Sequence, residues 1–316
     1  MTAAFLFPGQ GAQSAGLLHR LPQHPEVSRT IGEASRILGL DVAALDSADA
    51  LRSTAAVQEA LLIAGVATAR ALVAEHVSPA AVAGMSIGAF GAAVACGTLS
   101  FDDALPLVHL RGELMENAFP SGFGLAAIEG LDEVRMKAIV EGIRTAELPV
   151  YISNINAPRQ IVVAGSDSAL AAVMAQARQH GARRAQRLAV SVPSHCPLLQ
   201  PIADRLAQAM AGLTLRTPSM PYISNRGGRA LYDADAIRQD LATSIAHPVR
   251  WYSVLEVMRE LGATVFIELA PGDVSTHLVS ELFPGVRAVS IADHGLRYAT
   301  VVGGREIPFG PDVALN

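Results

Sequence analysis

Apolar residues along this chain alternate between short unbroken runs and longer stretches with helical spacing. The first run, Ala3 to Phe7, predicts a buried strand that enters a glycine turn at Pro8-Gly9-Gln10-Gly11. The pattern then predicts two helices, a second strand and an Ala-rich helix, at residues 25–38, 54–75, 80–84 and 87–96. Strands that alternate with helices predict an α/β fold with a parallel sheet covered on both faces.

The pattern changes between residues 122 and 189. Here it predicts strand, helix, strand, strand, helix and strand, at residues 125–128, 132–143, 150–154, 160–164, 167–180 and 185–190. This order is that of a ferredoxin-like domain. The larger pattern then resumes with a helix after Leu198, a strand over 264–269 and a turn at Pro271-Gly272 that leads into a helix. We therefore predict a large domain of residues 1–121 and 190–316, split by a small domain of residues 122–189.

Composition narrows the function classes. The chain has 316 residues, of which 51% are hydrophobic and 17% charged, which is typical of a compact enzyme and not of a disordered protein. A net charge of -5 gives no general attraction to nucleic acid or to an anionic membrane. The most apolar stretch, Leu61 to Ala74, is too short to span a bilayer and contains Arg70, which favours a core helix. We expect neither a nucleic-acid nor a membrane partner.

The cysteine count and the first residues indicate the compartment. Cys96 and Cys196 are too few for a disulfide framework, and neither lies in a metal-ligand spacing, so we predict no metal site. The N-terminal segment lacks the basic stretch and long apolar run of a signal peptide. We expect a cytoplasmic protein.

Gly84-Met85-Ser86-Ile87-Gly88 is the strongest chemical motif. It matches G-x-S-x-G and lies after a predicted strand and before a predicted helix, where such a turn exposes the serine hydroxyl. The start of the following helix favours developing negative charge, and the backbone N–H of Ile87 is expected to point into the site. An incidental serine in a glycine-rich turn is the alternative interpretation.

A serine hydroxyl needs a base to become a good nucleophile, and two histidines are candidates. His195 lies between two prolines in a predicted turn, Val192-Pro193-Ser194-His195-Cys196-Pro197, and His247 lies in Ala246-His247-Pro248. The spacing does not decide between them. Either base predicts a rate that rises with an apparent pKa of roughly 6 to 7.

Five motifs in order resemble the malonyl-CoA:acyl-carrier-protein transacylase family over nearly the whole chain. They are Phe7 to Gln13, the serine elbow, His109 to Met115, the segment from Asn156 to Gly165, and Val192 to Cys196. The resemblance implies an α/β-hydrolase-like large domain with a ferredoxin-like insertion. It also implies a malonyl-serine intermediate, with malonyl-CoA and the phosphopantetheine-type arm of an acyl carrier protein as substrates and no bound cofactor.

The resemblance implies a role for each site residue. Ser86 carries the acyl group, and His195 serves as base and acid. The N–H groups of Gln10 and Ile87 form the oxyanion hole, and Arg111 holds the malonyl carboxylate. The remaining implied residues are Asn156 and Ser194 for substrate binding, and Arg250, whose main-chain carbonyl would orient the histidine.

Two elbow positions depart from the usual family pattern, Gly-His-Ser-x-Gly-Glu, because Met85 replaces the histidine and Ala89 the glutamate. The segment Gly84 to Phe90 is similar to the transacylase subunit of malonate decarboxylase complexes. We therefore expect this subunit, with the other subunits of that complex as partners. A transacylase of fatty-acid or polyketide synthesis is the alternative.

Three further possibilities are open from the residues. A serine esterase or thioesterase shares the elbow, although such enzymes usually place the histidine nearer the C-terminus than His195. A catalytically silent partner subunit is disfavoured by the intact site motifs. Arg183, Arg184 and Arg187 form a basic cluster that either meets an acidic carrier protein or is simply solvated.

Overall fold

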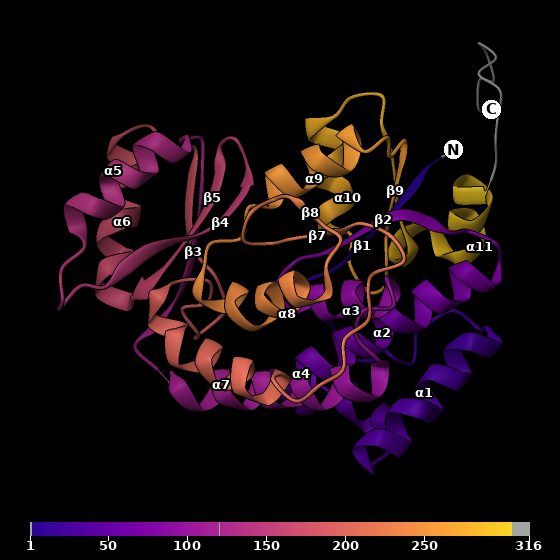
Figure 1. The fold of residues 1–316 in the computed structure, drawn as a ribbon. Helices are drawn as coiled ribbons and strands as arrows, with labels where there is room; N and C mark the ends of the chain where they lie inside the picture. The colour runs from indigo at the N-terminus through magenta and orange to yellow at the C-terminus, as the bar shows by residue number, and fades with distance from the viewer. Residues whose placement is uncertain (1, 120, 305–316) are drawn as a thin grey trace.

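The computed structural model describes residues 2–119 and 121–304, and two sheets organise it (Figure 1). The larger has six strands in the order β10-β9-β1-β2-β7-β8, and the smaller has four in the order β4-β5-β3-β6. The larger sheet contains β1 (Ala3–Phe7), β2 (Pro79–Gly84), β7 (Tyr222–Ile223), β8 (Ala230–Leu231), β9 (Val265–Glu268) and β10 (Arg287–Ser290). The smaller contains β3 (Phe123–Glu129), β4 (Val150–Ala157), β5 (Gln160–Ser166) and β6 (Arg184–Arg187).

Helices cover both faces of the larger sheet, as predicted. The helices are α1 (Pro25–Leu38), α2 (Thr54–Ala74), α3 (Gly88–Ala95), α4 (Phe101–Ala118), α5 (Glu133–Ile143), α6 (Asp167–Gln179), α7 (Gln200–Met210), α8 (Ala234–Thr243), α9 (Trp251–Glu260), α10 (Val274–Leu282) and α11 (Ile291–Gly304). Short 3₁₀ helices lie at Val42–Asp46, Ala50–Arg52, Pro197–Leu199 and Ser244–Ala246. All strand pairs of this sheet are parallel except β7 with β8.

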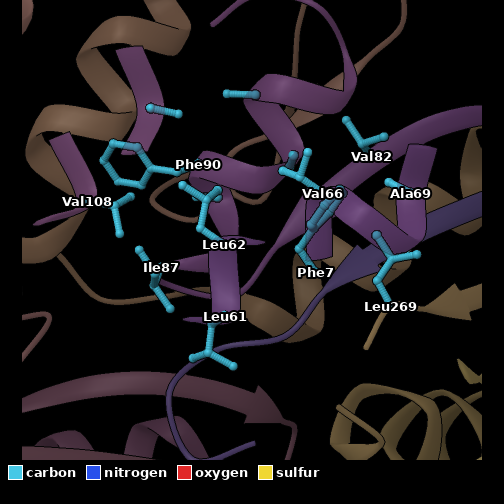
Figure 2. Packing of buried hydrophobic residues seen from close by; sticks show 14 of the residues in the cluster. Phe7, Leu61, Leu62, Val66, Ala69, Val82, Ile87, Phe90, Val108 and Leu269 are labelled. Atoms are coloured by element: carbon cyan, nitrogen blue, oxygen red, sulfur yellow. The ribbon is translucent and has the colours of Figure 1, made fainter. Parts of the chain in front are cut away.

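Successive residues of β1 enter two different cores, because side chains alternate across a strand. Phe5 and Phe7 pack with α2, α3 and α4, whereas Ala4 and Leu6 pack with α9 and α10 on the opposite face. Figure 2 shows Phe7 among the aliphatic side chains of α2, with Ile87 and Phe90 nearby. Because both faces of β1 are buried, its sequence is an unbroken run of apolar residues.

Helix α2 is the central helix of the first core. In the described part of the chain it alone is long and apolar enough to cross a membrane, because it begins at Thr54, ahead of the stretch singled out in the sequence. However, 89% of its most apolar window is buried inside the protein. A core helix therefore accounts for its composition.

The smaller sheet is antiparallel, and its two faces have different neighbours. One face packs on α5 and α6 (Figure 1), and the other packs through Leu125, Val162 and Ala164 on the segment around Cys196 and Leu198. The smaller sheet therefore backs the segment that contains His195. Its elements follow the predicted order within residues 122–189, while the domain boundaries themselves stay a prediction.

Candidate active site

Ser86 lies at the sharp turn between β2 and α3, with a positive φ of 55°. Strand β2 pairs with β1 in a register that places Gly84 opposite Phe7, and the Met85 N–H donates to the Phe7 carbonyl at 3.0 Å. A Cβ on Gly88 would lie 2.3 Å from the Phe7 carbonyl oxygen, so only glycine lets α3 begin this close to β1. The two loops that follow β1 and β2 therefore meet beside the serine.

His195 approaches this serine from the segment behind the smaller sheet. Its Nε2 lies 2.7 Å from the Ser86 Oγ, and its Nδ1 lies 2.9 Å from the Ser244 carbonyl oxygen. A carbonyl only accepts, so Nδ1 carries the proton in the neutral ring and Nε2 is free to accept from the serine hydroxyl. The histidine is 3% exposed and also has a positive φ, 62°. His247 instead bonds the Thr243 carbonyl through its own Nδ1.

Arg111 completes this cluster from the middle of α4. Its Nη2 donates to the Ser86 Oγ at 3.1 Å, and its Nη1 donates to Gln58 Oε1 at 2.7 Å. Gly112 lets α4 approach α2 closely enough for this second contact, because a Cβ there would lie 2.4 Å from the Ala55 Cα. Arg111 is 1% exposed, and within residues 2–119 and 121–304 it makes no salt bridge with a carboxylate. Such a buried guanidinium is suited to an incoming anion.

Burial and charge set the protonation states of His195 and Arg111. Burial, together with the charge of the Arg111 guanidinium, lowers the pKa of His195 from 6.5 to about 4. Burial also lowers the Arg111 pKa to about 10, which leaves that side chain charged at neutral pH. The imidazole is therefore neutral and able to act as a base well below pH 6.

The elbow offers one main-chain donor to an oxyanion. The Ser86 N–H donates to Asn225 Oδ1, and those of Gly88 and Ala89 donate to the Met85 and Ser86 carbonyls. The N–H of Ile87 has no acceptor in the described part of the chain. Gln10 lies in the turn after β1 and follows Gly9, where a Cβ would lie 3.0 Å from the Met85 carbonyl oxygen of the elbow. Both positions suit the predicted oxyanion hole, whose assignment remains a prediction.

Comparison with known proteins identifies the family. The acyl transferase domain family matches residues 4–303. The malonyl CoA-acyl carrier protein transacylases of Haemophilus influenzae and Escherichia coli K12 are each 38% identical, over 92% and 91% of this chain and 95% of their own length. The chain belongs to the malonyl-CoA:acyl-carrier-protein transacylase family.

Solved structures of this family have the same fold. The malonyl CoA-acyl carrier protein transacylase of Coxiella burnetii superposes with a TM-score of 0.91 at 35% identity, covering 96% of this chain and 98% of that one. A malonyl-transacylase in complex with a type II polyketide synthase acyl carrier protein gives 0.89 at 35% identity, with 96% and 99% covered. The α/β architecture with one mixed, mainly parallel sheet and one antiparallel sheet is thus shared with transacylase structures.

One transacylase assignment made from the sequence is wrong. Arg250 was expected to orient the histidine, but the carbonyl bonded to His195 Nδ1 is that of Ser244. The Arg250 carbonyl accepts instead from the Val254 N–H in the first turn of α9, so it is already used. Its side chain forms an ion pair with Glu133 of α5, with N–O distances of 3.0 and 3.1 Å.

The other two predicted substrate residues, Ser194 and Asn156, make no contact with Ser86, His195 or Arg111 through a side-chain hydrogen bond in the described residues. Ser194 precedes His195 and its carbonyl accepts from the Ser153 hydroxyl at 3.0 Å. Asn156 lies on β4 with a buried Oδ1 that has no partner in the described residues. The departures at Met85 and Ala89 are both apolar and both pack in the cores, Ala89 with the first and Met85 against the second.

Besides Ser244, sequence reasoning missed two residues of the site, Gln58 and Asn225. Each contacts a predicted site residue across a long chain separation, 53 residues from Gln58 to Arg111 and 139 from Asn225 to Ser86. Gln58 is a polar residue inside a predicted apolar helix, which was the sequence signal of a specific contact. In the structure it is fully buried. Asn225 follows a two-residue strand and offered no such signal.

Two further features concern Cys196, which follows His195, and the basic cluster of Arg183, Arg184 and Arg187. Cys196 is fully buried, and burial raises the pKa of its thiol to about 12, which makes it a poor nucleophile. In the basic cluster, Arg183 and Arg184 contact Glu129, and Arg187 contacts Asp167. These carboxylates offset much of the positive charge proposed for carrier docking.

Proposed function

We propose that this chain transfers malonyl from malonyl-CoA to an acyl carrier protein through a malonyl ester of Ser86. The observation that carries the proposal is that the Ser86 hydroxyl contacts both a base and a buried cation. The Ser86 Oγ lies 2.7 Å from His195 Nε2 and 3.1 Å from Arg111 Nη2. Family membership places the enzyme class as an acyl-carrier-protein S-malonyltransferase.

The geometry supports a two-step exchange. As Oγ attacks the thioester carbonyl, the Ser86 hydroxyl proton passes to His195 Nε2, and the oxyanion forms at the N–H groups of Gln10 and Ile87. The C–S bond then breaks, and the imidazolium gives its proton to the coenzyme A thiolate. In the second step the carrier thiol gives a proton to the same imidazole, its sulfur attacks the serine ester, and Oγ recovers the proton.

Arg111 supports an acyl group that ends in a carboxylate. Its guanidinium is buried and charged, and a malonyl carboxylate would accept from it while the thioester carbonyl lies at Ser86. Asn156 and Ser194 remain proposed contacts of the acyl group or of the pantetheine arm. A plain esterase or thioesterase has no need of this buried cation beside the nucleophile.

The comparisons favour a transacylase of fatty-acid or polyketide synthesis over the malonate decarboxylase subunit expected from the elbow sequence. The relatives described above are malonyl transacylases, one of them in complex with its polyketide carrier protein. Met85 and Ala89 pack as apolar residues and carry no evident partner-specific feature. We take an acyl carrier protein as the partner.

Finer features belong to the same proposal. The parallel sheet with a serine elbow supports an α/β-hydrolase-like large domain, and the strand order β4-β5-β3-β6 supports a ferredoxin-like small one. The exchange uses only side chains and main-chain donors, so we propose that it needs no resident cofactor. We propose a cytoplasmic location, where malonyl-CoA and carrier proteins would be met.

The test follows label from malonyl-CoA to the protein and then to carriers. Malonyl-[¹⁴C]CoA should label Ser86 within one turnover, and a holo acyl carrier protein should remove that label faster than water does. Ser86→Ala should abolish labelling, and His195→Ala should slow it by roughly three orders of magnitude or more, whereas His247→Ala should have little effect. Label on another residue, or release only to water, would overturn the proposal.

A further inference from the structure

Asn225 holds both sides of the nucleophile turn with one side chain. Its Oδ1 accepts from the Ser86 N–H at 2.9 Å, and its Nδ2 donates to the Gly84 carbonyl at 2.7 Å. The residue is 0% exposed. The amide orientation is fixed by chemistry, because turning it over would place donor against donor and acceptor against acceptor.

This contact acts on a strained backbone. In the described residues, non-glycine residues with positive φ are His76, Ser86 and His195. Such a conformation costs of order 1–3 kcal/mol and persists only where surrounding contacts impose it. The Ser86 amide has left the strand ladder and is not part of α3, so Asn225 supplies the acceptor that the turn lacks.

The loop that carries Asn225 is itself tied down. The Asn225 carbonyl accepts from the Arg250 N–H at 2.9 Å. Its neighbour Ser224 donates to Asp240 Oδ1 at 2.6 Å, and Tyr222 donates to the other Asp240 oxygen at 2.9 Å. Asp240 is 5% exposed and is satisfied by these hydroxyls. Asn225 is thus a rigid support, since its own position is set from β7, α8 and the start of α9.

We propose that Asn225 is a positioning residue for acyl transfer, which fixes the Ser86 turn so that Oγ meets His195 and the Ile87 N–H meets the oxyanion. It touches no reacting atom. The inference rests on the proposed role of Ser86 as the acyl carrier. It assigns part of the reaction rate to a side chain outside the serine, histidine and arginine cluster.

The first experiment measures single-turnover acylation by malonyl-CoA and the Kd of malonyl-CoA separately in wild type and Asn225→Ala. A misplacement of about 1 Å can cost roughly 100-fold in rate. We therefore expect acylation to fall by about that factor, with Kd unchanged. Thr30→Val is the control, because its buried hydroxyl also makes two hydrogen bonds, to the Glu26 carbonyl and from Arg70, far from the site on α1.

A second variant keeps the inference testable if Asn225→Ala fails to fold. Asn225→Asp retains an acceptor for the Ser86 N–H but, when ionised, offers no donor to the Gly84 carbonyl. The protonated acid regains a donor, so the ratio of variant to wild-type acylation rates should rise as pH falls from 8 to 5. A structural defect alone would give a ratio that does not respond to pH.

Labelling by an uncharged fluorophosphonate, from which the serine displaces fluoride, tests this inference independently of the proposed function. It reports Ser86 reactivity without using the malonyl carboxylate, and its labelling rate should fall in parallel in both Asn225 variants. Wild-type labelling rates in Asn225→Ala, or an equal loss in Thr30→Val, would overturn the positioning role. Failure of malonyl-CoA to label wild-type Ser86, with intact fluorophosphonate labelling, would instead overturn the proposed function.

Discussion

Arg111 is a buried cation, and the proposed function gives it the malonyl carboxylate as its partner. In Arg111→Ala the malonyl carboxylate would be buried unpaired, and losing one partner of such a pair costs about 3–5 kcal/mol, or roughly two to four orders of magnitude in kcat/KM. Acetyl-CoA has no carboxylate, so its transfer should hold steady or rise. The measurement is kcat/KM for both substrates in wild type, Arg111→Ala and Arg111→Lys.

Lysine is the matched control for charge, since it keeps the cation but loses the two-pronged donor. For malonyl transfer, we expect the kcat/KM of Arg111→Lys to lie between those of wild type and Arg111→Ala. Equal losses for malonyl and acetyl in Arg111→Ala would mean that Arg111 supports the structure through Gln58 and does not read the acyl group.

The protonation of His195 predicts an unusually acidic pH profile. Its pKa of about 4 in the free enzyme means that the neutral base persists as pH falls through 6, so kcat/KM for malonyl-CoA should stay flat to about pH 5. This replaces the pKa of roughly 6 to 7 that an ordinary histidine would give. A malonyl carboxylate at Arg111 would offset the charge that depresses this pKa, so the acid limb of kcat should lie at higher pH than that of kcat/KM.

The check is the acylation rate from pH 4 to 8 at low and at saturating malonyl-CoA, with Arg111→Gln alongside. Neutralising Arg111 removes one cause of the depressed pKa and should move the kcat/KM limb upward. An acid limb near 6.5 in wild type would contradict the burial argument.

At the residue scale, the sequence predicted the side chains that lie together at the site better than the residues that support them. Ser86 lies in a motif that forces exposure, and His195 and Arg111 are contiguous with motifs of the family, so all three were found and lie together. The orienting carbonyl could not be predicted from a side chain, because every residue has one. Asn225 and Gln58 were missed because their contacts depend on how distant segments pack.

At the scale of an element, the carboxyl group of Glu268 makes the stability of the protein depend on pH. The carboxylate is 1% exposed at the end of β9 and accepts from the N–H and hydroxyl of Thr276 at the start of α10, both at 2.8 Å. Burial raises its pKa from 4.5 to about 7, despite these two donors. Stability from this group is present below pH 4.5 and is lost as pH rises through 7, by at most about 3 kcal/mol.

Glu268→Gln keeps an acceptor for Thr276 and removes the charge. We therefore expect wild type to lose stability relative to this variant as pH rises from 5 to 8, by several degrees in Tm, given roughly 2 °C or more per kcal/mol. Thermal melts of both proteins at four pH values provide the test. Parallel pH curves would show that Glu268 does not titrate in this range.

Long elements were predicted well because their periodicity is sustained. Helix α1 has the predicted bounds, and α2 and α6 differ by one residue. Strands β7 and β8 have two residues each, too few to show any alternation, and were missed. Strand β6 ends at Arg187, three residues before the predicted end.

At the scale of the whole molecule, few polar contacts join the two sheets near the site. Val249 exchanges backbone hydrogen bonds with β4, donating to Ser153 and accepting from Ile155 at 2.8 Å each, and Arg250 pairs with Glu133. The ion pair between Arg250 and Glu133 is half exposed, and such pairs contribute about 0–1 kcal/mol to the free energy of unfolding.

Glu133→Gln should therefore lower Tm by no more than about 2–4 °C and leave kcat/KM for malonyl-CoA unchanged. Arg250→Ala should behave in the same way, since the carbonyl beside His195 belongs to Ser244. Melting curves and steady-state rates of the two variants decide this. A large loss of activity in Arg250→Ala alone would instead indicate a direct role for that side chain.

The sequence predicted a sheet with both faces buried, because apolar runs without alternation demand it. It did not predict the order β10-β9-β1-β2-β7-β8, in which β1 lies between β2, from the first third of the chain, and β9, from near its far end. Strand order depends on pairing between distant segments, which local patterns do not record.

The bond between Ser86 and His195 joins residues 109 apart, with the whole smaller sheet between them in the chain. Because the segment around His195 packs on the smaller sheet, we expect this contact to form only after both sheets have formed and docked. Contacts between distant segments form late because loop closure must come first. During refolding, helix content should therefore return before any catalytic competence, and a newly made chain stays inert on the ribosome until its last strands emerge.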